Sequence, residues 1–409
     1  MPSKPKRRTA PKARAARKPR RAARSTHLPL SGIRVVEFSH MVMGPTCGMI
    51  LGDLGAEVIK VEPPAGDKTR SLIGSGAGFF PLFNRNKKSV SADLSDPKDR
   101  ARIERLIASA DIVSENFRPG ALKKYGFDYA ALKKKHKRLI YVSHKGFLPG
   151  PYEHRVALDE VVQMMAGLAY MTGPPGRPLR AGSSVNDIMG GMFGVIGALA
   201  ALAERERTGK GQEVQVGLFE NCVLLSAQHM LQYRLTGLAS PPMPDRINAW
   251  GVFDLFDTAD GEQVFLGVVT DTQWAVFGRA FDLGGLADDP RLATNTLRVK
   301  ARAWMLPALR EIVRRYSARE LQDVFEREGL PYAPIVRPEQ LFDDPHLLAS
   351  GGLAELMLDN GETTPVPLLP LLLGGRHLKP RMRLPKVGEH DGEVAPLRRD
   401  ARRRARPAR

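Results

Sequence analysis

Residues 33–62 read IRVVEFSHMVMGPTCGMILGDLGAEVIKVE, and this stretch decides the fold. Two β-type runs, 33–38 and 57–62, enclose a helical segment at 44–54. A strand, a short helix and a second strand at this spacing predict a parallel pair joined by a right-handed crossover. The alternation continues, with strands predicted at 89–94, 111–116 and 138–143 and a helix predicted at 96–109. The sequence therefore predicts an α/β fold whose parallel sheet is covered on both faces.

The rest of the chain predicts two lobes of different size. Residues 28–236 are expected to form a large Rossmann-like α/β lobe, and residues 237–336 a smaller inserted α+β lobe. Residues 337–397 are expected to return to the large lobe, which is then built from both chain ends. Tails at 1–27 and 398–409 lie outside the two lobes. Other predicted elements are helices at 158–171, 188–207 and 219–235, a strand at 213–218, and hairpins turning at 259–261 and 359–361.

The basic charge of the chain is concentrated at its two ends. The formal net charge is +18. Residues 1–30 hold eleven Lys or Arg and no acid, and residues 398–409 hold seven Arg and one Asp, so the body between them is nearly neutral. Both tails lack a repeating apolar face and are expected to be disordered. Weak contact with polyanions stays open, whereas we expect no specific nucleic-acid binding.

Several classes of protein do not fit the sequence. The longest apolar stretch, 188–203, is shorter than the roughly 20 residues that span a bilayer. No apolar signal segment follows the basic start. Cys47 and Cys222 are too few for a disulfide framework. We therefore expect a cytoplasmic protein without a membrane span.

Common nucleotide, metal and hydrolase motifs are also missing. The turn at 40–45 lacks the glycine fingerprint of a dinucleotide site, although Glu62 ends the second strand as such sites require. The histidines are scattered and show no metal-ligand spacing, so we expect no metal site. No GxSxG motif offers a serine nucleophile.

Asp187 begins the most apolar helix of the chain and is followed by Gly190 and Gly191. Spacing alone favours an N-cap, because Asp accepts hydrogen bonds from the free N–H groups of a helix start. The same position suits a nucleophile. The helix dipole should keep its carboxylate ionised, and the glycines should leave room for an acyl group and expose N–H groups to an oxyanion.

Blocks of sequence in a fixed order carry a family resemblance. They include residues 115–120 (ENFRPG) and the segment around Asp187, and further blocks at 30–38, 44–45, 54–62, 84–89, 150–152, 206–212 and 388–390. Over residues 28–396 the chain is similar to family III CoA-transferases. The resemblance implies an acyl-CoA:carboxylate CoA-transferase working through a covalent mixed anhydride and an aspartyl-CoA thioester on Asp187. It also implies an interlocked homodimer.

The resemblance further implies a groove for CoA, which would be a substrate and not a tightly bound cofactor. The partners of the enzyme would be an acyl-CoA and a carboxylic acid, whose identities the sequence leaves open. For Lys124, a solvated helix face is the alternative. The implied groove residues are Val42, Met43, Asn86, Lys87, Lys88, Asn116, Phe117, Arg118, Lys124 and Lys145.

Two departures from the family pattern bear on the reaction. Relatives that transfer formyl groups carry a Gly-rich loop in the small lobe, whereas residues 246–251 here hold one Gly, which argues against formyl or oxalate chemistry. The racemase branch places a His where this chain reads ALDEV at 157–161, so a proton-transfer partner is missing. Because His154 lies nearby, a 2-methylacyl-CoA racemase remains the alternative.

Overall fold

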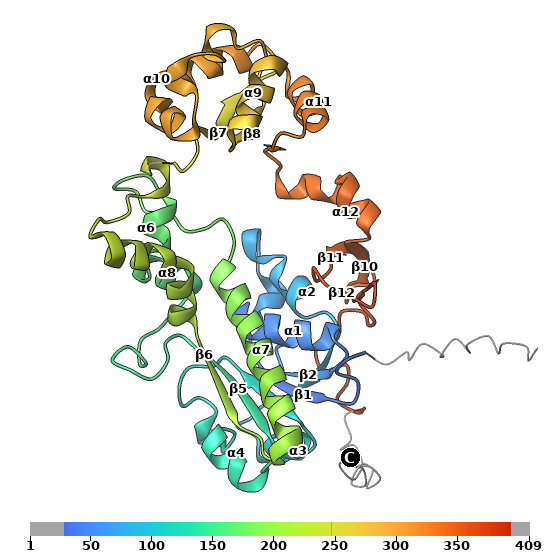
Figure 1. The fold of residues 1–409 in the computed structure, drawn as a ribbon. Helices are drawn as coiled ribbons and strands as arrows, with labels where there is room; N and C mark the ends of the chain where they lie inside the picture. Colours follow the sequence, from blue (N-terminus) through green and yellow to red (C-terminus); the bar gives the residue numbers. More distant parts are fainter. Residues whose placement is uncertain (1–27, 247, 394–409) are drawn as a thin grey trace, which may run out of the picture.

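The computed structural model describes residues 28–246 and 248–393, and its centre is one parallel sheet (Figure 1). The strands lie in the order β3-β2-β1-β4-β5-β6, and Val35 of β1 lies beside Val58 of β2 and Ile112 of β4. The strands are β1 Arg34–Phe38, β2 Glu57–Glu62, β3 Lys87–Ser91, β4 Ile112–Glu115, β5 Ile140–Lys145 and β6 Glu213–Gly217. The expected α/β class, with a Rossmann-like sheet, is confirmed.

Alternate residues of the strands build one core on each face of the sheet. Val35 belongs to a core shared with helices α1 and α7, whereas its neighbour Val36 belongs to a core shared with α3 and α4. Runs of Val and Ile suit these strands because side chains alternate and both faces are buried. The helices are α1 Met43–Asp53, α3 Pro97–Ala108, α4 Tyr129–Lys135 and α7 Val185–Thr208.

Four predicted elements of the large lobe differ in the structure, one of them the strand expected at 138–143, which lies two residues later at Ile140–Lys145. The helix expected at 158–171 is two helices, because Gly167 has a φ of +83° and redirects the chain between them. The third strand and the long helix both begin earlier than expected, at Lys87 and Val185. The two short helices are α5 Asp159–Met165 and α6 Leu168–Thr172; elements not predicted are η1 Lys68–Ser71, η2 Gly74–Gly76, α2 Phe79–Phe83 and η3 Lys123–Tyr125.

The smaller lobe follows helix α8 (Leu218–Thr236) and has its own sheet and core. Its strands pair antiparallel in the order β7-β8-β9, and the predicted hairpin turns at Gly261, whose φ is +79°. Buried aromatic side chains such as Phe277 and Phe325 fill the core. The elements are η4 Met243–Asp245, β7 Val252–Asp257, β8 Gln263–Val268, α9 Asp271–Ala280, η5 Gly284–Leu286, η6 Pro290–Leu292, α10 Asn295–Val313, α11 Ala318–Glu328 and β9 Tyr332–Pro334.

The last part of the chain returns to the large lobe. The N–H of Ser91 in β3 donates to Asp391 Oδ1 at 2.8 Å, and the N–H of Ser89 donates to His390 Nδ1 at 3.2 Å. The C-terminal segment therefore covers the β3 edge of the sheet. Its elements are η7 Pro338–Asp343, α12 Pro345–Ser350, β10 Leu353–Met357, β11 Thr363–Pro367, β12 Leu372–Leu373 and β13 Arg376–His377.

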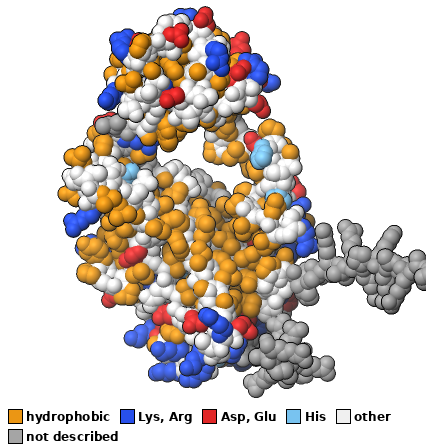
Figure 2. Space-filling view, viewed as in Figure 1, with side chains coloured by type: hydrophobic (Ala, Val, Ile, Leu, Met, Phe, Trp, Pro, Cys, Tyr) orange, Lys and Arg blue, Asp and Glu red, His pale blue; other side chains and the backbone are white. Residues whose placement is uncertain are grey.

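Two separate connections join the lobes, one after α8 and one through α12 (Figure 1). In the space-filling view an opening lies between the smaller lobe and the large lobe, and hydrophobic side chains cover much of the face below it (Figure 2). The basic tails that we expect to be disordered, 1–27 and 398–409, and for which weak contact with polyanions stays open, lie outside the described residues.

Helix α7 is longer than the apolar stretch seen in the sequence. By length and composition it could cross a membrane, and it is the one such helix among the described residues. The expectation that the apolar stretch at 188–203 is too short for a membrane span is therefore wrong about the length of the helix. Val195 and Ala198 of α7 are buried in the core that the helix shares with α1 and the sheet. Packing in the protein core gives a structural reason for part of its apolar composition, while other apolar side chains such as Ile196 are exposed.

Candidate active site

Asp187 lies in the first turn of α7, as the third residue of the helix. Ser184 occupies the N-cap position, so the interpretation of Asp187 as the N-cap is wrong. The Asp187 side chain is half-buried. It stands at the positive end of a long helix dipole, which favours an anion.

A second carboxylate, Asp159 of α5, holds the backbone of this first turn. Its Oδ2 accepts hydrogen bonds from the N–H groups of Asn186 and Asp187, both at 3.0 Å. Gln163, one turn further along α5, donates to Oδ1 of Asp159. Asp159 is buried. The start of α7 is therefore fixed by an acceptor that water barely reaches, a role that the sequence did not reveal.

The pKa of Asp187 is raised to about 7. Burial is the largest cause, the negative charge of Asp159 adds to it, and the positive charge of Arg180 opposes it. The helix dipole, which we expect to favour the ionised carboxylate, is therefore opposed by the loss of solvation and by the charge of Asp159. Near neutral pH, the protonated and ionised forms of Asp187 coexist.

Gly190 and Gly191 serve helix packing and do not open space for a ligand. A Cβ atom on Gly190 would lie 2.5 Å from Met43 Cε, and one on Gly191 would lie 2.7 Å from the Met43 carbonyl oxygen. Both glycines thus let α7 approach α1 closely. Their N–H groups lie beyond the first turn of α7, inside its own hydrogen bonding. The expected acyl space and oxyanion donors must come from elsewhere.

A cavity of about 520 Å³ adjoins the first turn of α7. Ser184 and Ile188, which stand on either side of Asp187 in the chain, contribute to its wall. This volume is in the range of small-molecule sites, about 300–1,000 Å³. The other lining residues are Ser75, Gly78, Phe79, Leu82, Phe83, Arg180, Ala181, Gly182 and Ser183. Asp187 itself is not among the lining residues, so the cavity offers space for an acyl group next to the turn that carries Asp187.

The turns after β1 and β4 meet at the carboxyl end of the sheet. The Asn116 side chain donates to the His40 carbonyl at 2.7 Å and accepts from the His40 N–H at 3.0 Å, and the Phe117 ring stacks on the His40 ring. The strand order reverses between β1 and β4. Ligands of open α/β sheets bind in the crevice at such a point, so Asn116 and Phe117 occupy a position suited to a ligand.

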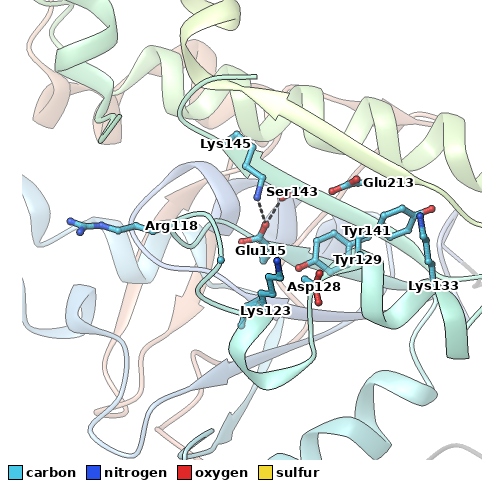
Figure 3. A pocket seen from close by; sticks show the side chains of 13 residues that line it. Glu115, Arg118, Lys123, Asp128, Tyr129, Lys133, Tyr141, Ser143, Lys145 and Glu213 are labelled. Atoms are coloured by element: carbon cyan, nitrogen blue, oxygen red, sulfur yellow. Dashed lines mark hydrogen bonds and ion pairs between the residues drawn. The ribbon is translucent and has the colours of Figure 1, made fainter. Parts of the chain in front are cut away.

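A second cavity, of about 300 Å³, lies beside the ends of β4 and β5 (Figure 3). The Lys145 ammonium and the Ser143 hydroxyl both donate to Glu115, the former at 3.0 Å. Arg118 also lines this cavity and is exposed, with its side chain extending away from the Glu115 cluster (Figure 3). Lys124 is exposed nearby, with its ammonium 4.6 Å from the Tyr125 ring centroid.

The structure places Asn86, Lys87 and Lys88 apart from this group, at the start of β3. The fully buried Lys87 ammonium donates to Glu37 at 2.9 Å, to the Pro45 carbonyl at 2.9 Å and to Asn84 at 3.1 Å. The buried Asn86 amide donates to Asp53 at 2.7 Å. Lys88 pairs with Glu57 at 3.0 Å. These contacts support structural roles, especially for Lys87, whose ammonium has no path to a ligand.

Val42 and Met43 are both buried, with 1% and 5% of their surface exposed. Met41, which the sequence did not single out, is the exposed residue of this turn and has a φ of +62°. A side chain with exposed apolar surface at the carboxyl end of β1 is the better candidate for contact with a ligand. The sequence could not reveal the left-handed φ of Met41, because residues other than glycine rarely adopt it.

His154, the residue that kept the racemase alternative open, is exposed on the loop between β5 and α5. No contact between His154 and Asp187 is recorded among the described residues. Within residues 28–246 and 248–393, no group of three or more His, Cys, Asp or Glu side chains could hold a metal ion.

The chain is similar to known proteins over nearly all of its described length. A family model described as CoA-transferase family III matches residues 30–391. A succinate–glutarate CoA-transferase of Agrobacterium fabrum is 34% identical, covering 90% of this chain and 94% of that protein. An acetyl-CoA:oxalate CoA-transferase of Acetobacter aceti is 34% identical, covering 80% and 87%. A CAIB/BAIF family protein from Brucella suis has a crystal structure with a TM-score of 0.81 and 34% identity, covering 89% and 97%.

The fold and these relatives define an enzyme of the CoA-transferase class. The chain belongs to CoA-transferase family III. The family resemblance and the transferase activity expected from the sequence are thereby confirmed.

Proposed function

We propose that this enzyme moves CoA from an acyl-CoA to a free carboxylic acid through covalent intermediates on Asp187. One observation carries the proposal: Asp187, a half-buried carboxylate of raised pKa, stands in a helix turn whose backbone N–H groups are held by Asp159, and Ser184 and Ile188 of the same region line a cavity large enough for an acyl group. Partial removal from water leaves the anion less solvated and therefore more reactive. The names of the relatives, which include succinate–glutarate and acetyl-CoA:oxalate CoA-transferases, support carboxylic acids as acceptors.

The proposed exchange proceeds by acyl and thiolate transfers that need no external energy source. The Asp187 carboxylate attacks the thioester carbonyl; a C–O bond forms, the C–S bond breaks, and CoA leaves as the thiolate. The thiolate attacks the Asp187 carbonyl of the mixed anhydride, giving an aspartyl-CoA thioester and the free donor acid. The acceptor carboxylate then attacks the carbonyl of the aspartyl-CoA thioester, which displaces the thiolate and forms a second mixed anhydride. The thiolate attacks the acceptor's carbonyl in this anhydride and releases the product acyl-CoA and the free Asp187 carboxylate.

We propose that the CoA part lies in the crevice at the carboxyl ends of β1, β4 and β5. Asn116, Phe117 and Met41 would contact the ligand at the reversal of the strand order. Lys145 and Arg118, which line the cavity of Figure 3, and the exposed Lys124 would supply positive charge for phosphates. The contacts of Lys87 argue for leaving it out of this set.

Covalent trapping tests the proposed function. Incubation with succinyl-CoA without acceptor, followed by hydroxylamine, should convert Asp187 to a hydroxamate that peptide mass spectrometry detects. Asp187→Ala should carry no modification and should lose at least about 1,000-fold in exchange rate, because a nucleophile cannot be bypassed. Modification of another residue, or full exchange by Asp187→Ala, contradicts the proposal.

We also propose that two chains form an interlocked homodimer. Large apolar side chains are exposed on α7 and α8, among them Ile196 at 57%, Leu231 at 62% and Leu235 at 84%. Exposed apolar surface of this kind marks a protein interface. The opening between the lobes gives a second chain room to pass (Figure 2). Light scattering of the purified protein should give the mass of two chains, and a monomer mass contradicts the proposal.

A further inference from the structure

Arg180 is the one charged side chain in the wall of the cavity beside Asp187, as far as the described residues show. The remaining lining separates into two kinds of surface. Ser75, Ser183 and Ser184 bring hydroxyl groups, whereas Phe79, Leu82, Phe83 and Ile188 bring apolar surface. An occupant of this cavity therefore meets an apolar wall, several hydroxyl groups and a single positive charge.

The Arg180 guanidinium is held in place before any ligand arrives. Its Nε donates to the Ala181 carbonyl at 2.9 Å, and its Nη1 donates to Glu160 at 2.8 Å. Among the described residues, no hydrogen bond or ion pair is recorded for Nη2. Glu160 is not part of the cavity wall. The guanidinium thus has its ion-pair partner outside the cavity, and one of its donors is left for a ligand.

The same short helix, α5, supports both Arg180 and Asp187. Asp159 accepts from the N–H of Asp187, Glu160 pairs with Arg180, and Gln163 accepts from the N–H of Ala181 at 2.9 Å. These side chains come from two successive turns of α5. One rigid element therefore sets the positions of the nucleophile and of the cation relative to each other, as a site that measures substrate length requires.

We propose that Arg180 binds the distal carboxylate of a dicarboxylic substrate whose other carboxylate reacts at Asp187. The inference rests on the proposed function and adds a substrate class to it. The methylene carbons between the two carboxylates would lie on the apolar wall formed by Phe79, Leu82 and Ile188. A guanidinium is the side chain best suited to a carboxylate, because its planar donors match two carboxylate oxygens.

Arg180 also has a simpler possible role, which a test must separate from this one. Its positive charge opposes the rise in the pKa of Asp187, so it could assist catalysis only by stabilising that anion. Such an effect would act equally on every acceptor acid. A contact with a distal carboxylate acts only on acids that possess one.

The test compares Arg180→Met with the wild-type enzyme on acceptors that differ at one end. Succinyl-CoA is the donor, and the acceptors are glutarate, its monomethyl ester and pentanoate. In a two-step exchange, kcat/KM for the acceptor reports the second half-reaction, so an effect on the donor does not enter. We expect a loss of about 10- to 100-fold for glutarate, mostly in KM, which is the size of one charge-assisted contact. The other two acids should change less than about twofold.

Two further variants make the outcome decisive. Arg180→Lys should recover part of the preference for glutarate, and Arg177→Met, an exposed position on the same loop outside the cavity wall, should match the wild type. An equal loss for all three acids, a loss confined to kcat, or no preference for glutarate in the wild type overturns the role of Arg180. A wild-type enzyme that exchanges none of the acids instead contradicts the proposed function itself.

Discussion

Asp187→Asn should abolish CoA exchange and, at the same time, make the protein more stable at pH 8. In the folded protein the pKa of this carboxyl is raised from 3.8 to about 7. The charged form is therefore disfavoured on folding, and stability is lost as the pH rises from about 4 through about 7. Asn removes that cost. After discounting for partial access of solvent, we expect a gain of about 1–2 kcal/mol in the free energy of unfolding.

The pH dependence of this gain identifies its cause. Thermal unfolding of the wild type and of Asp187→Asn should differ at pH 8 and converge as the pH falls towards 4, because Asp187 is protonated in both the folded and the unfolded protein there. Asp323→Asn, a change on α11 that removes only an exposed ion pair with Arg319 at 3.2 Å, should not alter activity and should change stability by less than about 0.5 kcal/mol. Equal melting curves for wild type and Asp187→Asn at pH 8 would contradict the raised pKa.

Activity should follow the same ionisation. Only the anion of Asp187 attacks a thioester, so the exchange rate of the wild type should fall as the pH is lowered through about 7. An initial-rate profile between pH 5 and pH 9 measures this limb. A rate that stays constant down to pH 5 would show that Asp187 is ionised throughout the range.

Lys87→Met should destabilise the protein by about 3–5 kcal/mol, the usual effect of leaving a buried charge without its partner. Lys87 and Glu37 are both fully buried, with Nζ and Oε1 2.9 Å apart. Lys60 is a more distant cation, 3.8 Å from Glu37, and replaces only part of the lost interaction. Chemical denaturation measures the loss. The double variant Glu37→Gln/Lys87→Met should be more stable than Lys87→Met alone, because no unpaired charge remains.

Lys145→Met is the matched comparison for Lys87→Met. Lys145 is partly exposed and lines the cavity near β4 and β5, but its partner Glu115 is buried and keeps the Ser143 hydroxyl and the Phe117 N–H as donors. Removal of Lys145 should therefore cost less stability than Lys87→Met, about 1–3 kcal/mol. It should also raise KM for the acyl-CoA. The opposite pattern, a stable Lys87→Met with a raised KM and an unchanged Lys145→Met, would show that the groove had been assigned to the wrong lysine.

The strands of the large sheet could be predicted from the sequence because their physical cause is local. Runs such as residues 33–38 and 57–62 are rich in Val and Ile, and a strand buried on both faces needs such residues. The start of α7 was harder to predict. The sequence around Val185 and Asn186 contains no signal for a helix start. The N–H groups of this first turn are held by Asp159, which lies 28 residues before Asp187.

The residues of the candidate site also differ in how far the sequence could predict their roles. Asp187 could be proposed from the sequence because a family motif marks it, whereas the contacts of Lys87 depend on Glu37, fifty residues earlier in the chain. A lysine at the start of a strand gives no sign of whether its ammonium meets a phosphate or a buried carboxylate. Arg180 was missed for a similar reason. Its significance arises from the cavity and from α5, and neither can be derived from the spacing of residues alone.

In the proposed interlocked homodimer, the two connections between the lobes have a consequence for how the protein is made. A chain tied together at two points encloses a loop, and two such loops passed through each other form a link, like adjacent rings of a chain. Dilution cannot separate linked subunits; one of them must first unfold. The partners would therefore have to meet before either finishes folding, and an assembled enzyme would keep its original partner throughout its life.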